Sequence, residues 1–305
     1  MKVRALHTPS RLGRRLLCAA LALAGACSKA PDADPGSSAA GPGVPRRIVS
    51  LVCAATDIFQ ALGEMDRLVA VEEDCPCAGT EGMAKIRNED HPGKAAALNV
   101  ESVLALRPDA VVAKPDLRPA LEGRGFHVVW TLPDLTRDNV ADLVGKIGAL
   151  LRCPERAQAL LDRMAEREAD LRRRTADLPR VRVYYETTGI GGTVGGPSVV
   201  DAMIELAGGR NIAHDVAKAY TTLTPEAIFA ADPDVIVLGG YADPVDVVKA
   251  RPGWDRLKAV REGRVFQIPL ARRGVSLATP RCVEECERLF LPWLHPELGL
   301  PAVGR

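Results

Sequence analysis

The chain has 305 residues, 47% hydrophobic and 26% charged, which is enough apolar material for two ordinary domains and excludes an intrinsically disordered chain. Its formal net charge of +1 is unevenly placed. Five basic and no acidic side chains precede Cys27, so the rest carries 35 basic (40 − 5) against 39 acidic side chains, a net −4. This balance disfavours a nucleic-acid partner.

The basic N-terminal residues lead into an apolar run at 16–26, which is too short to span a bilayer but has the length of a secretory signal core. Small residues at 24–26 precede Cys27, and this sequence resembles a bacterial lipobox. By that resemblance residues 1–26 are a signal peptide and Cys27 is the lipidated N-terminus; an ordinary secretory cleavage nearby is the alternative. Residues 27–46, rich in Pro, Gly, Ala and Ser, are expected to form the anchor and a flexible tether.

Residues 47–52, apolar except for Arg47 and Ser50, predict the first buried strand, and Cys53, Ala54 and Thr56 follow it in a short loop. Thr56 is expected to cap a helix over 57–62. Loops at the carboxyl ends of strands are where open α/β sheets bind ligands, so these residues are candidate ligand contacts.

A second buried strand at 68–71 opens into a polar loop that contains Glu73, Cys75 and Cys77. Cys75 and Cys77 are too close in sequence to bond each other comfortably. Any disulfide from this loop therefore needs a partner farther along the chain.

One stretch occurs twice, at 98–113 and 223–238. In each copy a glutamate lies in the first turn of a predicted helix, Pro-Asp ends the helix, and a continuous apolar run predicts a parallel strand buried on both faces. The identical pairs are Leu98/Leu223, Glu101/Glu226, Ala105/Ala230, Pro108/Pro233 and Asp109/Asp234. Charge-rich helical stretches lie between the copies. The sequence thus predicts two similar α/β lobes with central parallel sheets, joined by a long helix, with a ligand cleft between them.

The expected divisions are an N-terminal lobe at 47–135, connecting helices at 136–179, a C-terminal lobe at 180–296 and a tail at 297–305. A glycine-rich loop at 189–197 has neither the dinucleotide-binding nor the P-loop pattern, which disfavours a nucleotide ligand.

Four segments, 47–51, 101–109, 208–212 and 278–281, occur in an order that resembles the periplasmic binding proteins for vitamin B12, haem and iron-siderophore complexes, the rigid-helix (class III) receptors of ABC importers. The resemblance implies a monomeric receptor without catalytic residues. Its cargo would be a cobalt- or iron-containing complex, a corrinoid or an iron-siderophore or haem, delivered to an inner-membrane permease and its ATPase.

In B12 receptors of this family, a surface glutamate on each lobe docks onto permease arginines, and Glu101 and Glu226 match those positions. The alternative, compatible with docking, is that each carboxylate only stabilises its helix through the dipole. The strand-end rule gives the remaining ligand candidates, and the full set is Cys53, Ala54, Thr56, Glu73, Lys114, Asp116, Glu186, Tyr241, Arg272 and Arg273. Arg272 and Arg273 suit ligand carboxylates, or they form an exposed loop pair.

Six cysteines remain beyond the signal and the lipobox: Cys53, Cys75, Cys77, Cys153, Cys282 and Cys286. In an oxidising compartment an even number predicts disulfides. The alternative is a soft-metal site with thiolates from Cys53, Cys75 and Cys77 as ligands, because thiolates prefer copper and zinc. That site would favour an exported copper or zinc binding protein or chaperone. A thiol oxidoreductase using Cys75 and Cys77 is a third, weaker interpretation.

Overall fold

The computed structural model describes residues 43–73, 75, 77–87, 98–131, 139–269 and 280–301. The N-terminal lobe contains β1 (Ile48–Ser50), α1 (Cys53–Ala61), β2 (Leu68–Glu72), β3 (Ala84–Ile86), α2 (Val100–Ala105), β4 (Ala110–Ala113), α3 (Arg118–Leu121) and β5 (His127–Trp130). Short 3-10 turns lie at Met65–Arg67 and Pro115–Leu117.

The connecting helices are α4 (Val140–Leu150) and α5 (Pro154–Thr175). The C-terminal lobe contains β6 (Val181–Glu186), β7 (Gly192–Val194), α6 (Val199–Leu206), β8 (Gly209–Asn211), β9 (Tyr220–Thr222), α7 (Pro225–Ala231), β10 (Val235–Leu238), α8 (Val245–Lys249), α9 (Lys258–Arg261), β11 (Val265–Gln267), α10 (Cys282–Glu285) and α11 (Leu291–Leu294). A π-helical turn at Cys286–Phe290 joins the last two helices, and 3-10 turns lie at Trp254–Arg256 and Pro296–Leu298.

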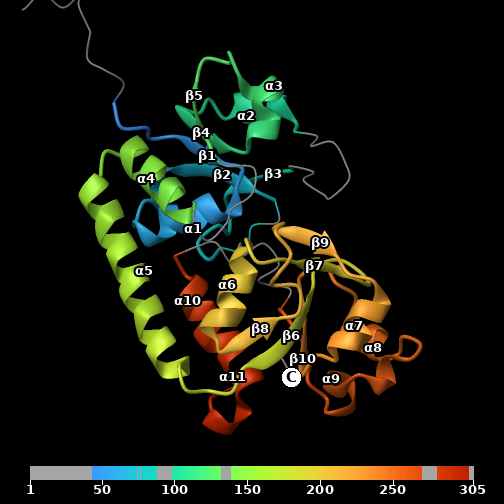
Figure 1. Ribbon diagram of the computed structural model, residues 1–305. Helices are drawn as coiled ribbons and strands as arrows, with labels where there is room; N and C mark the ends of the chain where they lie inside the picture. Colours follow the sequence, from blue (N-terminus) through green and yellow to red (C-terminus); the bar gives the residue numbers. More distant parts are fainter. Residues whose placement is uncertain are drawn as a thin grey trace, which may run out of the picture. The chain divides into compact units, whose positions relative to one another are not determined.

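Each lobe is a parallel sheet covered by helices on both faces. The strand order is β3-β2-β1-β4-β5 in the first lobe and β11-β10-β6-β8 in the second (Figure 1). Alternate residues of β1 point into two different cores: Ile48 packs with α1, α4 and α5, and Val49 packs against residues of α2 and α3. Two lobes with parallel sheets, expected from the repeat, are thereby confirmed.

The helix α5 takes part in the cores of both lobes. Ala157 and Leu160, near its start, are buried in the core of the first lobe, whereas Leu171, near its end, is buried in that of the second. A continuous helix of 22 residues, packed at both ends, is a stiff connection.

The repeated Pro-Asp motif fastens each helix–strand unit to the central strand of its own lobe. Asp109 accepts hydrogen bonds from the backbone N–H groups of Arg46 and Arg47 at 2.8 and 2.9 Å, and Asp234 accepts one from Arg182 at 2.9 Å. The arginine side chains return the contact, because Arg47 donates to the Leu106 carbonyl and Arg182 to the Ala231 carbonyl. The lobes therefore share the same internal fastening.

The first helix begins earlier than the sequence indicated. Its first residue is Cys53, and Thr56 lies inside it instead of capping it. The Thr56 hydroxyl is buried and donates to Ser50 Oγ at 2.9 Å. Because a strand-end hydroxyl satisfies Thr56, the helix does not need it as a cap, and the expected start at residue 57 is wrong.

The glycine-rich loop owes its composition to close packing of backbones. It contains β7, which pairs antiparallel with β9. At Gly191 φ is +87°, and an added Cβ would lie 2.2 Å from the Leu223 carbonyl oxygen. Only glycine fits there.

Candidate functional site

Three thiols meet at the carboxyl ends of two neighbouring strands. Cys53 begins α1 directly after β1, and Cys75 and Cys77 follow β2, which is parallel to β1. The Sγ atom of Cys53 lies 2.8 Å from that of Cys75 and 3.7 Å from that of Cys77, and the latter two are 3.2 Å apart. The three residues are only 2–7% exposed. The structure thus brings together the three cysteines that the sequence analysis grouped.

Local hydrogen bonds hold the two chain segments that carry these thiols. The backbone N–H of Cys53 donates to Glu72 Oε2 at 3.1 Å, and that of Cys75 donates to the Glu72 carbonyl at 3.1 Å. The Thr80 hydroxyl donates to the Cys77 carbonyl at 2.8 Å. The sulfur positions therefore follow from backbone fixed at both strand ends.

The thiols divide their charge unequally. Hydrogen bonds with Cys53, which has the larger effect, and with Cys77 hold the pKa of Cys75 well below its ordinary value. Hydrogen bonding with Cys75, and then with Cys77, together with burial raises the pKa of Cys53. For Cys77, a hydrogen bond with Cys53 lowers the pKa, but the hydrogen bond with Cys75 and burial outweigh it, so the net effect is a raised pKa. A thiolate is the form of cysteine that acts as a nucleophile or as a metal ligand, and here two thiol neighbours stabilise one.

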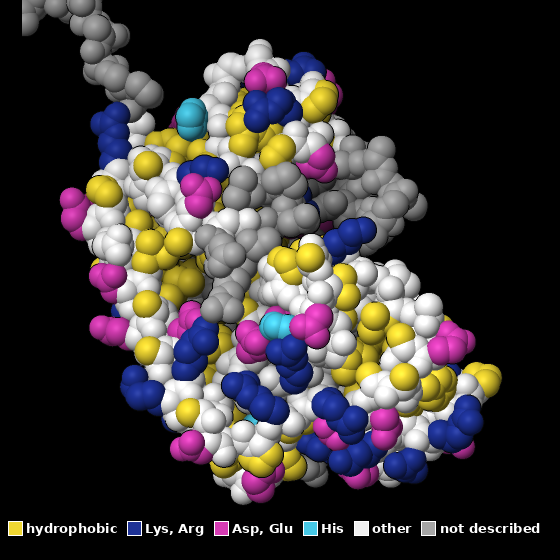
Figure 2. All heavy atoms as spheres, viewed as in Figure 1, with side chains coloured by type: hydrophobic (Ala, Val, Ile, Leu, Met, Phe, Trp, Pro, Cys, Tyr) yellow, Lys and Arg dark blue, Asp and Glu magenta, His cyan; other side chains and the backbone are white. Residues whose placement is uncertain are grey.

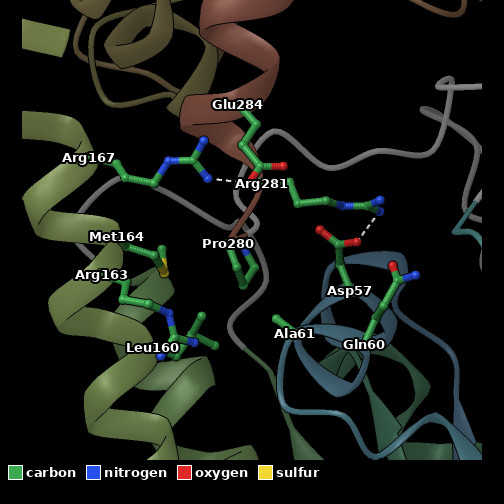
Figure 3. Close-up of a pocket in the computed structure, with 10 residues that line it drawn as sticks. All are labelled: Asp57, Gln60, Ala61, Leu160, Arg163, Met164, Arg167, Pro280, Arg281 and Glu284. Atoms are coloured by element: carbon green, nitrogen blue, oxygen red, sulfur yellow. Dashed lines mark hydrogen bonds and ion pairs between the residues drawn. The ribbon is translucent and has the colours of Figure 1, made fainter. Parts of the chain in front are cut away.

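A charged pair lies next to the thiols. Asp57, one helical turn after Cys53, places Oδ1 3.8 Å from Cys77 Sγ and forms an ion pair with Arg281 of the C-terminal lobe (Figure 3). The side chain of Asp57 is 1% exposed, and among the described residues its Oδ2 has no hydrogen-bond partner.

A cavity of about 350 Å³ opens beside this pair, between α1, α5 and the start of the last helical segment (Figure 3). Arg163 and Arg167 of α5 line it together with Met164, and Arg167 pairs with Glu284. The cavity wall is thus both charged and apolar, and it includes side chains from both lobes.

In the C-terminal lobe, the strand-end carboxylate is committed to an internal ion pair. Glu186 is fully buried and accepts two hydrogen bonds of 2.7 Å from the Arg251 guanidinium and one of 3.1 Å from the Tyr184 hydroxyl. Arg251 also donates to Asp243 at 2.7 Å and lies over the Trp254 ring, 4.5 Å from its centroid.

The other expected ligand residues lie in varied settings. Ala54 is fully buried in α1, and Tyr241 is 56% exposed after β10. Glu73 is exposed and pairs with Arg87 at 2.9 Å. Lys114 is half-buried and Asp116 exposed, both just after β4. Arg272, Arg273 and the expected lipidation site Cys27 lie outside the described residues.

Glu101 and Glu226 occupy the same place in the two lobes. Each is exposed in the first turn of its helix, α2 or α7. The caps are equivalent too: Asn99 accepts from the Ser102 N–H and Thr224 from the Ala227 N–H. The placement suits both a docking role and the helix dipole.

The remaining cysteines are separate from the cluster. Cys153 is buried at the start of α5, and Cys286 is buried and donates to the Met203 carbonyl at 3.1 Å. Burial raises the pKa of both Cys282, to about 12, and Cys286. All six described cysteines are free thiols in the structure, so it contains none of the expected disulfides among them.

A second group of metal-binding residue types is internally satisfied. Asp201 Oδ2 lies 2.9 Å from His214 Nδ1, and Asp201 Oδ1 accepts from Asn211 at 2.9 Å. Glu205 stands 3.7 Å from the same His214 nitrogen. Both oxygens of the central carboxylate thus have protein partners.

Two members of the site were not predicted. Asp57 follows Cys53 at a helical spacing of four residues, and Arg281 lies in the last segment of the family resemblance. Those were the available signals, but nothing in the sequence indicated that residues 224 positions apart would pair.

Residues 48–271 match the family of periplasmic binding proteins. The chain belongs to this family. The proteins it is similar to are binding proteins for transport and not enzymes, in agreement with the expectation of a binding protein.

A cobalamin-binding protein of Halobacterium salinarum is 33% identical over 210 residues, 66% of this chain; the aligned part is just over half of that relative, 56%. A vitamin B12-binding protein of Vibrio parahaemolyticus is 26% identical over 256 residues, 79% of this chain and 88% of the relative. A periplasmic haem-binding protein of Pseudomonas aeruginosa has the same fold, with a TM-score of 0.68 at 23% identity over 83% of this chain and 93% of that one.

Acidic and basic side chains are interspersed on the face shown in Figure 2. Within the part of the chain that the structure describes, we find no helix with the length and apolar character needed to cross a membrane.

Proposed function

We propose that the chain is the substrate-binding component of an ABC importer, that it captures a cobalt- or iron-containing chelate of the corrinoid, haem or siderophore class, and that it delivers this cargo to an inner-membrane permease and its ATPase. The observation that carries the proposal is the family match across both lobes, supported by curated relatives that are cobalamin- and vitamin B12-binding proteins. Corrinoids are the first cargo to test.

The same proposal includes export and a lipid anchor at Cys27, which would hold a monomeric receptor at the membrane surface. The lipobox-like residues before Cys27 support this part. Globomycin treatment should make the uncleaved, membrane-bound precursor accumulate, and Cys27→Ala should abolish metabolic labelling with palmitate without changing the affinity of the folded domain for the chelate.

Cargo class can be tested by titrating the purified mature protein with cyanocobalamin, haem and a ferric hydroxamate siderophore. We expect one bound chelate per chain, seen as a shift of the ligand absorption bands and as quenching of tryptophan fluorescence. Absence of binding for all three classes would contradict the proposal.

Permease docking is assigned to Glu101 and Glu226 on the basis of their exposure and their equivalent places on the two lobes. A two-fold partner can contact such a pair symmetrically. We expect Glu101→Lys with Glu226→Lys to leave chelate affinity unchanged and to abolish uptake in cells.

Glu155 and Asp246 provide the matched control, because each is an exposed acidic residue in the first turn of a helix, α5 or α8, outside the repeat. Glu155→Lys with Asp246→Lys removes comparable helix-dipole stabilisation, about 0.3–1 kcal/mol per site. Uptake should survive this change. Equal loss of uptake in both double variants would show that the repeated glutamates only stabilise their helices.

A further inference from the structure

The three thiols of Cys53, Cys75 and Cys77 differ from the other cysteines of the chain, because each has two sulfur neighbours within 3.7 Å. We propose that they form a binding site for one thiophilic metal ion of the Zn²⁺ or Cu⁺ class, distinct from the chelate cargo. Thiolates are the ligands that select these ions. Nothing in this proposal depends on which chelate the protein carries.

The sulfur triangle suits an ion with one open coordination position. Its sides of 2.8, 3.2 and 3.7 Å give a circumscribed radius near 1.9 Å. With metal–sulfur bonds of about 2.3 Å, an ion equidistant from the three sulfurs would lie about 1.3 Å out of their plane. It would therefore cap the triangle and leave its outer side free. Cys53 and Cys75 would move apart by less than about 1 Å to reach tetrahedral spacing.

The charges at this place are compatible with a bound cation. An ion that binds displaces the thiol protons, so three thiolates and Asp57 would then bring four negative charges, against one positive charge on Arg281 through its pair with Asp57. Burial of such charge is costly without compensation, and the cation supplies part of it. The Asp57 oxygen Oδ2, buried and without a partner among the described residues, is a second and independent indication of a missing electropositive neighbour.

A disulfide accounts for the cluster less well. Bonding any two of the three sulfurs leaves the third as a buried thiol beside the bond. Cys153 and Cys286 are also buried in apolar cores, but the sulfur–sulfur contacts that the structure describes all lie among Cys53, Cys75 and Cys77. Convergence of three cysteines from two strand ends is the arrangement of a ligand set.

The test uses the mature protein, purified both with and without reductant under anaerobic conditions. Bound zinc and copper are measured by elemental mass spectrometry, and affinities by competition with a chromophoric chelator for Zn²⁺ and, separately, for Cu⁺. We expect one ion per reduced chain. Replacement with Co²⁺ should give thiolate-to-cobalt charge-transfer bands together with the intense visible bands of a four-coordinate ion.

Cys75→Ser should weaken ion binding by about 100-fold or more, because loss of an outer hydrogen-bond partner alone costs 10–100-fold. Cys153→Ser is the matched control: it removes one buried thiol outside the cluster and should leave ion affinity unchanged. If Cys75→Ser does not fold, alkylation mapping of the wild-type protein gives the same information, since the ion should protect the three clustered cysteines and not Cys282.

Three results would overturn the inference. The first is a reduced protein that binds neither ion. The second is a protein isolated without reductant whose mass is lower by two hydrogens and whose peptide map shows a bond within the cluster. The third is joint loss of ion and chelate binding in Cys75→Ser, which would make the thiolates part of the cargo site. Retained chelate binding with lost ion binding supports a separate site, and ion binding without any chelate binding would refute only the proposed function.

Discussion

Replacing Arg281 should show how much this residue contributes to the stability of a fold that buries the Asp57 carboxylate. The two members of the pair are unequally buried, since the Asp57 side chain is 1% exposed and that of Arg281 is 31% exposed. Arg281→Met keeps a long side chain but removes its charge, so a buried carboxylate is left without its charged partner. Breaking a buried pair in this way costs about 3–5 kcal/mol, and we expect the free energy of unfolding to fall by that amount.

The opposite change is expected to cost less. Asp57→Asn leaves a guanidinium that is accessible to water, so about 1–2 kcal/mol should be lost, mainly the charged hydrogen bond. The double variant Asp57→Asn/Arg281→Met should resemble Asp57→Asn, because neither contains an uncompensated buried charge. The two single effects would then be strongly non-additive, as for other residues in direct contact.

Urea unfolding followed by circular dichroism and by tryptophan fluorescence gives the four free energies, provided that the two signals coincide. In thermal unfolding, the loss in Arg281→Met corresponds to a decrease in Tm of roughly 6–20 °C, at 2–4 °C per kcal/mol for a chain of this size. Equal costs for the two single variants would refute the argument from unequal burial. A cost below about 1 kcal/mol for Arg281→Met would show that Asp57 does not need Arg281 at all.

Two further predictions concern stability within the C-terminal lobe. Among the described residues, Arg251→Met leaves the buried Glu186 carboxylate with the Tyr184 hydroxyl as its one hydrogen-bond donor, so unfolding in urea should show a loss of about 3–5 kcal/mol, whereas Glu186→Gln/Arg251→Met should recover part of it. For Asp234, burial raises the pKa, but hydrogen bonds from Arg182 and Lys258 lower it by more. The pKa of this carboxylate is therefore lower in the folded state than in the unfolded state. The ionised Asp234 carboxylate therefore stabilises the fold above the unfolded-state pKa of about 3.9, and this contribution is lost as the pH falls below that value. Asp234→Asn should flatten the decline of the urea-derived unfolding free energy in that pH range. An unchanged slope would exclude Asp234 as a source of acid sensitivity.

The frame of each lobe was predictable because it depends on short-range patterns. Continuous apolar runs gave the buried strands, and the repeated Pro-Asp motif marked the junction of helix and strand. The equivalent register is a consequence: Ile48 lies beside Ala110 in one sheet and Val183 beside Val235 in the other. Hydrophobic periodicity and proline chemistry act over a few residues and can be read directly from the sequence.

The cysteine cluster was predictable for a different reason. Once β1 and β2 are assigned as neighbouring parallel strands, their following loops must lie at one edge of the sheet. Cys53 and Cys75 are then close whatever their side-chain conformations. The distance of 2.8 Å between the Sγ atoms of Cys53 and Cys75, by contrast, depends on the hydrogen bonds that Glu72 accepts, and no pattern in the sequence reveals those bonds.

Long-range charged pairs were beyond the reach of sequence reasoning. Glu186 was expected to contact ligand because it ends a strand, but Arg251, 65 residues later, binds its carboxylate within the lobe. The identity of such a partner depends on the tertiary structure. An arginine in a loop has the same neighbours in sequence whether it is buried in an ion pair or exposed to solvent. This is also why the Asp57–Arg281 pair was missed.

The two lobes are alike where they are fastened and unlike where their strands end. Arg47 with Asp109, and Arg182 with Asp234, repeat the same contacts at the amino ends of the central strands. At the carboxyl ends, by contrast, the first lobe gathers thiols near Cys53 and the second closes around Glu186. Duplication of a lobe supplies a common frame without dictating the side chains at its binding edge. Because the fastening contacts lie away from that edge, the strand ends are free to differ, and the asymmetry between thiols and an internal ion pair is where specificity for cargo and ion should be sought.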